Sequence, residues 1–178
     1  MHNRISITGP ESTAKSWLSK ELAKHYNSCF VEEYSREYLD GKRKYDRNDI
    51  LKITKKQLLN EEEQAGMCNS VLFCDTDILV NKIWSNYVFN ECDNWIENEF
   101  VQHEYGLYLL CFPDIKWEFD PLRENRDNRN ILFEIYENEL KNAGFNYKII
   151  KGIGNKRLQN AVKFVDDYLL SKQIVNVR

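Results

Sequence analysis

The sequence predicts an α/β fold in which a five-stranded parallel sheet is covered by helices on both faces. Two observations predict it. Short apolar segments typical of strands alternate with segments of helical periodicity along the whole chain. A phosphate-binding pattern also lies directly after the first of these strand-like segments. The length of 178 residues fits one domain, so we expect residues 1–178 to form a single unit.

Each predicted strand is a short apolar run, separated from the next by enough residues for a helical crossover. The predicted strands are Arg4–Thr8, Cys29–Glu32, Val71–Asp75, Leu107–Phe112 and Tyr147–Ile150. The clearest helical stripe is formed by Leu158, Ala161, Val162, Val165 and Leu169. Ligands of open parallel sheets bind at the carboxyl ends of the strands, so the chemistry is expected just after each strand.

Composition excludes several classes of function. Hydrophobic residues make up 42% and charged residues 30% of the chain, and the net charge is -3 with both signs interspersed. No basic block indicates a nucleic-acid partner, and the apolar runs are too short to span a membrane. The N-terminus lacks a secretory apolar region, so we expect a cytoplasmic protein. The five cysteines have no CxxC spacing, which favours reduced thiols over a metal site.

A phosphate-binding pattern follows the first predicted strand. The segment GPESTAKS, residues 9–16, matches the P-loop pattern G-x-x-x-x-G-K-[ST] at Gly9, Lys15 and Ser16. In such a loop, backbone N–H groups and the lysine bind phosphate oxygens, and the hydroxyl completes a Mg²⁺ shell. We therefore expect ATP and Mg²⁺ as cofactors of a P-loop NTPase fold; an ordinary helix-capping turn is the alternative. The residues expected to contact the nucleotide are Gly9, Pro10, Glu11, Ser12, Thr13, Ala14, Lys15, Ser16 and Trp17.

One position departs from that pattern. Ala14 stands where the pattern has its second glycine. A methyl group there would crowd a phosphate, or would strain the loop if the backbone needs a positive φ. We expect this substitution to weaken ATP binding without removing it.

Two aspartates follow the third predicted strand. Residues two apart on an extended chain face the same way, so the carboxylates of Asp75 and Asp77 are expected to point at the phosphate loop. Asp75 would hold Mg²⁺ together with Ser16, and either carboxylate would accept a proton from an acceptor hydroxyl. For Asp77 the alternative is a cap on the next helix, ILVNKIW.

The second predicted strand ends in VEEYSREYL. A carboxylate such as Glu33 would there lie across the crevice from the γ-phosphate, where an acceptor binds, and Arg36 would clamp that acceptor or neutralise its charge. The alternative is a surface ion pair at three-residue helical spacing.

An arginine-rich segment, FPDIKWEFDPLRENRDNR, follows the fourth predicted strand. Arg123, Arg126 and Arg129 are three residues apart, so we expect them to share one face of a helix. As a lid over about residues 114–129 they would stabilise charge on the transferred group and exclude water, Arg123 most and Arg129 least. The alternative is a solvated, salt-bridged surface segment.

Two tryptophans are candidates to stack on a planar substrate ring. Trp84 lies in a predicted helix, which favours core packing. Trp117 lies in a loop flanked by acidic residues, which favours contact with a ligand.

Taken together, GPESTAKS, EEYSREYL, FCDTDILVNKIW and LYLLCFPDIKWEFDPLRENRDNR resemble the ribosylnicotinamide kinase domain of NadR-type P-loop proteins, in order from about Arg4 to the final helix. The resemblance implies a nucleoside-kinase-like fold with a lid. It implies transfer of the γ-phosphate of ATP to the 5′-hydroxyl of nicotinamide riboside, giving nicotinamide mononucleotide in NAD salvage. It carries phosphate-loop roles to Gly9, Lys15 and Ser16. It carries the family's acid, arginine and lid patterns to Glu33, Arg36, Asp75, Asp77, Trp117, Asp120, Arg123 and Arg126.

The riboside also suits the residues on physical grounds. Its pyridinium ring is cationic, and carboxylates and tryptophan faces attract such a ring.

NadR-type proteins commonly carry an adenylyltransferase domain ahead of the kinase. The phosphate loop here begins at residue 9, so we expect no such domain and no synthesis of the dinucleotide itself.

Three functions remain open at this point. The first is a nicotinamide riboside kinase, in which Lys15 and the lid arginines stabilise the transferred group and one of Asp75, Asp77 and Glu33 accepts the proton. The second is a kinase of another nucleoside or deoxynucleoside. The third, raised by Ala14, is a non-catalytic nucleotide-binding regulatory module. The partner is in each case a small molecule, and the sequence leaves the oligomeric state open.

Overall fold

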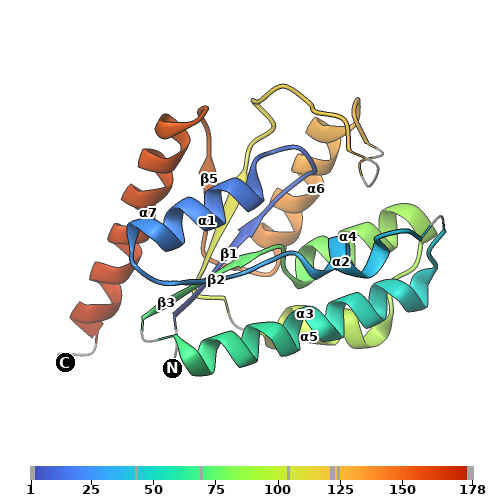
Figure 1. Cartoon of the computed structure of the whole chain (residues 1–178), viewed down its shortest axis with the longest axis horizontal. Coiled ribbons are helices and arrows are strands. Elements are labelled where there is room, and N and C mark those ends of the chain that lie inside the picture. Colours follow the sequence, from blue (N-terminus) through green and yellow to red (C-terminus); the bar gives the residue numbers. More distant parts are fainter. Residues whose placement is uncertain are drawn as a thin grey trace.

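A computed structural model describes residues 3–42, 44–68, 70–103, 105–120, 123 and 125–175. Five strands form one parallel sheet in the order β2-β3-β1-β4-β5 (Figure 1). The strands are β1 (Asn3–Thr8), β2 (Cys29–Val31), β3 (Val71–Asp75), β4 (Leu107–Cys111) and β5 (Tyr147–Ile150). The predicted five-stranded parallel sheet is confirmed, and each predicted strand end lies within one residue of the observed end.

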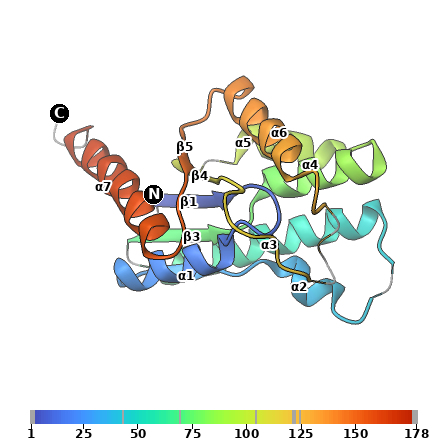
Figure 2. The same cartoon turned by 90° about the horizontal axis from the view of Figure 1, so that it is seen from above.

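Helices cover the two faces of the sheet in two layers (Figures 1 and 2). The helices are α1 (Lys15–His25), α2 (Tyr34–Leu39), α3 (Arg47–Met67), α4 (Ile78–Phe89), α5 (Asn94–Gln102), α6 (Arg129–Asn142) and α7 (Asn155–Val175). One core forms between the sheet, α1 and α7, and the other forms between the sheet and helices α3 to α6. No helix in the described ranges is both long enough and apolar enough to cross a membrane.

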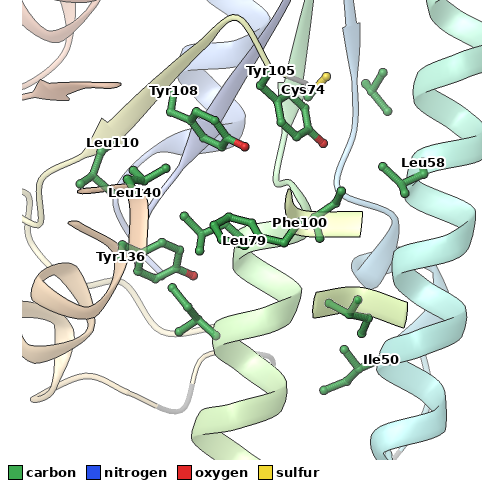
Figure 3. Packing of buried hydrophobic residues seen from close by; sticks show 14 of the residues in the cluster. Ile50, Leu58, Cys74, Leu79, Phe100, Tyr105, Tyr108, Leu110, Tyr136 and Leu140 are labelled. Carbon is green, nitrogen blue, oxygen red and sulfur yellow. The ribbon is translucent and has the colours of Figure 1, made fainter. Parts of the chain in front are cut away.

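Side chains of the central strands alternate between the two cores because successive residues of a strand point to opposite faces. In β3, Leu72 and Cys74 pack with α3 to α6, whereas Val71 and Phe73 pack with α1 and α7. Figure 3 shows the larger core, where rings and aliphatic side chains from several elements meet. Its labelled members include Leu79 of α4, Phe100 of α5, Tyr108 of β4, and Tyr136 and Leu140 of α6.

Strand β1 departs from this apolar alternation on one face. Ile5 and Ile7 belong to the core against α1 and α7, but Ser6 and Thr8 point to the opposite face and are fully buried. Their hydroxyls donate hydrogen bonds to the carboxylate of Asp77, the residue that caps α4. The sequence RISITG therefore provides an apolar surface that packs against α1 and two hydroxyls that bind the cap residue of α4.

Close packing of β4 against α7 requires a residue without a side chain at position 106. A Cβ added to Gly106 would lie 1.8 Å from the hydroxyl oxygen of Tyr168, a buried residue of α7. We expect Gly106→Ala to lower the free energy of unfolding by about 1–3 kcal/mol, because Tyr168 must shift out of its packed position.

The matched control is Gly66→Ala in α3, where an added Cβ meets no atom within 4 Å. Alanine favours a helix, so this variant should be about 0.5–1 kcal/mol more stable than the parent. Urea titrations of both variants measure the difference. Equal stability of the two would contradict the described packing of β4 on α7.

Candidate active site

The phosphate loop lies at the carboxyl end of the central strand and leads directly into α1. Residues 9–14 connect Thr8 of β1 to Lys15, the first residue of the helix. Gly9 has a φ of +125°, and a Cβ there would lie 2.9 Å from the carbonyl oxygen of Cys111 at the end of β4. The Nζ atom of Lys15 donates to the carbonyl oxygens of Gly9 and Pro10, both at 2.9 Å. The Lys15 side chain therefore folds back onto the phosphate loop.

The start of α1 is left open for an anion. The cap position of the helix is occupied by Ala14, which has no side-chain oxygen to accept the first helical N–H groups. Those N–H groups carry the positive end of the helix dipole. Ala14 has a φ of +60°. The left-handed backbone that the sequence analysis raised for this position is therefore present, although the residue is not glycine. Such a conformation costs about 1–2 kcal/mol for a residue with a Cβ.

Asp75 ends β3 beside the first turn of α1. Its side chain is 2% exposed, and its Oδ1 atom has no hydrogen-bond partner among the described residues. Burial, together with the charge of Glu33, raises the pKa of Asp75 to a net value of about 6. A hydrogen bond with Ser16 and the charges of Lys15 and Arg36 act in the opposite direction.

The side chains of Asp75 and Ser16 fit a magnesium ion. A buried carboxylate oxygen without a partner costs several kcal/mol unless a cation or donor satisfies it, and a serine hydroxyl lies beside it. Mg²⁺ in nucleotide sites typically takes one or two protein oxygens and completes its shell with phosphates and water. Asp75 and Ser16 are the residues that would hold it.

Asp77 lies on the other face of the sheet. The expectation that the two aspartates face the same way is wrong, because the strand ends at Asp75 and Thr76 turns the chain with a φ of +75°. Asp77 is fully buried, and its carboxylate accepts hydrogen bonds from Ser6, Thr8 and the backbone N–H of Val80. It therefore caps α4, as the alternative had it, and it is not among the described residues that line the cavity at the phosphate loop.

A cavity of about 630 Å³ extends from the phosphate loop between α2, α4, α6 and the lid. All nine residues predicted to contact the nucleotide line it, from Gly9 to Trp17. At one end it is bounded by Ile115, Lys116, Ile153, Gly154 and Arg157. At the other end its walls are aromatic and aliphatic, formed by Leu39, Tyr45, Val80, Ile83, Trp84, Tyr87, Val88, Leu132 and Tyr136. One cavity therefore brings the phosphate loop together with an aromatic and aliphatic wall.

Glu33 and Arg36 lie on the wall of this cavity, at the start of α2. The Arg36 guanidinium contacts the carboxylate of Glu33 at 3.3 Å and donates to Asp120 of the lid at 2.8 Å. The i,i+3 ion pair of the alternative is thus present, and it also bridges to the lid. The structure brings three of the predicted site residues together in one charged row.

The described residues of the lid segment, residues 114–129, form no helix before Arg129, whereas the sequence predicts one. Residues 121, 122 and 124 of that segment lie outside the described residues. Arg123, Arg126 and Arg129 do not share a helix face, because α6 begins only at Arg129 and the preceding NRDN sequence favours a turn. Arg123 lines the cavity and donates to the carbonyl oxygen of Glu118 at 2.7 Å. Arg126 is exposed and lies over the ring of Trp117.

The two tryptophans lie in different surroundings. Trp84 lines the aromatic end of the cavity, and its Nε1 donates to the hydroxyl of Tyr45 at 3.0 Å. Trp117 lies over the phosphate loop, where its Nε1 donates to Glu11 at 3.3 Å. The loop position of Trp117 predicts contact with a ligand. Among the described residues, however, the cavity wall includes Trp84 from α4 and not Trp117.

Sequence reasoning did not identify several residues of the cavity. Tyr136 belongs to a helical stripe that indicates core packing, and Tyr45 carries no motif. Arg157 is fully buried and donates to Asp114, Phe112 and Gly152, which fixes the turn between β5 and α7 at the cavity's edge. The run KGIGNKR, with two glycines directly after the fifth strand, is a sequence signal that indicates a turn at this wall.

Comparison with known families places these features in context. A family model described as an AAA domain matches residues 4–157. Among curated proteins, the chain is 24% identical over 144 residues to the trifunctional NAD biosynthesis/regulator protein NadR of Escherichia coli strain K12. That match covers 75% of this chain and 35% of the relative.

Solved structures share the fold. A NadR protein in complex with NR has a TM-score of 0.82 at 21% identity, and one in complex with NAD and AMP-PNP has 0.77 at 20%. Each match covers 94% of this chain, which spans about half of those chains, 50% and 49%. A deoxyadenosine kinase from M. mycoides, solved with products, has a TM-score of 0.63 at 13% identity, over 92% of this chain and 99% of that one.

Replacing Ala14 by glycine should stabilise the protein. The left-handed backbone at this position suits glycine, so Ala14→Gly should raise the free energy of unfolding by about 1 kcal/mol. The control is Asn90→Gly at the end of α4, where φ is +56° and asparagine tolerates the conformation, so the gain should be smaller. Thermal unfolding measures both. A destabilised Ala14→Gly variant would contradict the loop geometry.

Asp75 makes stability depend on pH. Its folded pKa of about 6 lies above the unfolded value of 3.8, so the folded state holds this proton more tightly and stability falls as pH rises from about 4 to 6. In magnesium-free buffer, Asp75→Asn should therefore be more stable than the parent by about 1–3 kcal/mol at pH 8, with the difference disappearing at pH 4. Urea titrations across this range test it. A difference independent of pH would be contrary to this description of Asp75.

Proposed function

We propose that this chain, which belongs to the P-loop AAA-domain family, is an ATP-dependent kinase that phosphorylates the 5′-hydroxyl of nicotinamide riboside. One observation carries the proposal: the phosphate loop and the carboxylate of Glu33 line a single cavity with aromatic walls, and the buried Asp75 lines an adjoining cavity that shares Ser16, Glu33, Arg36 and Arg123 with it. Similarity to NadR proteins, one of them solved with NR and one with AMP-PNP, supports the choice of both substrates.

On the phosphate side, the chain supplies positive charge and fixed donors. The N–H groups at the start of α1 and the Nζ atom of Lys15 bind the β- and γ-phosphate oxygens, Lys15 exchanging its present carbonyl partners for them. Asp75 and Ser16 would hold Mg²⁺, which when bound neutralises charge that develops on the phosphates. Arg123 lines the same cavity and stabilises the transferred group from the lid side.

On the acceptor side, we assign Glu33 as the carboxylate that accepts the proton of the 5′-hydroxyl. It lines the cavity, whereas Asp77 caps α4 from the other face and Asp75 is committed to the metal. Arg36 holds one carboxylate oxygen of Glu33 in place at 3.3 Å. The ring of a planar cationic substrate would stack among Trp84, Tyr45 and Tyr136. Most of the rate then comes from positioning and charge stabilisation.

A second candidate is a kinase of another nucleoside. The similarity to deoxyadenosine kinase supports it, because that match covers nearly the whole of the other chain. The aromatic end of the cavity would accept other planar rings. The phosphate side of the mechanism is the same in both cases.

A substrate panel with ATP and Mg²⁺ tests the proposal. We expect nicotinamide riboside to be phosphorylated with a higher kcat/KM than deoxyadenosine, deoxycytidine or thymidine. We expect Asp75→Asn to lower kcat by at least about hundredfold while remaining folded. A strong preference for a deoxynucleoside would transfer the proposal to the second candidate. Binding of ATP without transfer to any nucleoside would indicate a regulatory module.

A further inference from the structure

An acidic residue in a phosphate-binding loop needs a physical reason. Glu11 is the third residue of the loop and lines the cavity beside the space for the triphosphate. A carboxylate a few ångströms from phosphates of the same sign opposes their binding. The cost is offset if the carboxylate is turned away and held by other donors.

The lid provides those donors. The backbone N–H of Asn125 donates to Oε1 of Glu11 at 2.8 Å, and Nε1 of Trp117 donates to the same oxygen at 3.3 Å. Hydrogen bonds to a charged acceptor are roughly twice as strong as those between neutral groups. One side chain of the loop, Glu11, therefore accepts hydrogen bonds from two separate lid residues, Trp117 and Asn125.

The neighbouring residue makes a second connection. The hydroxyl oxygen of Ser12 accepts a hydrogen bond from the N–H of Glu118 at 3.0 Å, and its carbonyl oxygen accepts one from Arg129 at 3.0 Å. Ser12 has a φ of +54°, a conformation outside the ordinary range for serine. Among the described residues, four hydrogen bonds therefore join the lid to two adjacent residues of the phosphate loop.

These connections enclose Arg123. Its guanidinium donates to the carbonyl oxygen of Glu118, whose N–H is held by Ser12. Two residues further along, the N–H of Asn125 is held by Glu11. Glu118 and Asn125, which lie on either side of Arg123 in the sequence, are thereby held by hydrogen bonds to the loop that would bind the phosphates.

We propose that Glu11, assisted by Ser12, is a positioning residue that ties the lid to the phosphate loop and so places Arg123 against the transferred phosphate. The inference rests on the proposed kinase function for its effect on rate. Its structural part, the coupling between loop and lid, can be measured with nucleotide alone.

Amide hydrogen exchange of Asn125 and Glu118, with and without AMP-PNP and Mg²⁺, tests the coupling directly. We expect nucleotide to slow both amides in the parent protein. In Glu11→Ala the Asn125 amide should exchange at least about tenfold faster than in the parent with nucleotide present, and Glu11→Gln, which keeps an acceptor oxygen, should restore most of the protection. Glu134→Ala, which removes an exposed carboxylate from α6, is the matched control and should match the parent.

Kinetics provide the second readout. Glu11→Ala should lower kcat by about tenfold to hundredfold with a smaller change in the KM for ATP, and Glu11→Gln should stay within about threefold of the parent. Unchanged protection of the Asn125 amide in Glu11→Ala, or equal kcat in the alanine variant and the parent, would overturn the proposal. If the parent phosphorylates no nucleoside, the kinase proposal fails, and the exchange rates still decide whether Glu11 couples loop and lid.

Discussion

The burial of one carboxylate beside a helix N-terminus is the constraint on which the rest of this site depends. Asp75 is held at the end of a central strand, almost out of contact with water, and one of its oxygens has no hydrogen-bond partner in the part of the chain that the structure describes. Such a charge is tolerated only next to cations or strong donors. Ser16 and Lys15 of the phosphate loop lie beside it, and the position of the loop is in turn set by Gly9 against β4. Fold and site are therefore specified by the same few residues.

The central sheet separates the two aspartates that the sequence analysis placed on one side, Asp75 and Asp77. On the face toward α1, the strand ends carry the residues suited to phosphate and metal. On the face toward α4, Ser6, Thr8 and Asp77 form a buried polar contact that anchors the helix bearing Trp84. One residue, Thr76, turns the chain between the two faces. The acidic strand end thus serves both the phosphate side of the cavity and its acceptor wall.

Much of this arrangement could be predicted from local patterns, because strands, phosphate loop and helical stripes each have a short-range signature. The five strands and the phosphate loop between β1 and α1 are examples. The lid could not, since its path is set by contacts with Glu11 and Ser12 that are over one hundred residues distant in sequence. The aromatic cavity wall was missed for the same reason, because a residue such as Tyr136 looks like a core residue until its neighbours in space are known.

The most direct measurement is a crystal structure of the protein grown with AMP-PNP and Mg²⁺. We expect the triphosphate to lie against the N–H groups of residues 9–16, with the Lys15 side chain turned onto it. We also expect a metal ion held by the Ser16 hydroxyl next to Asp75. Nucleotide bound elsewhere in the cavity, or a metal ion that leaves Asp75 buried and unpartnered, would contradict it.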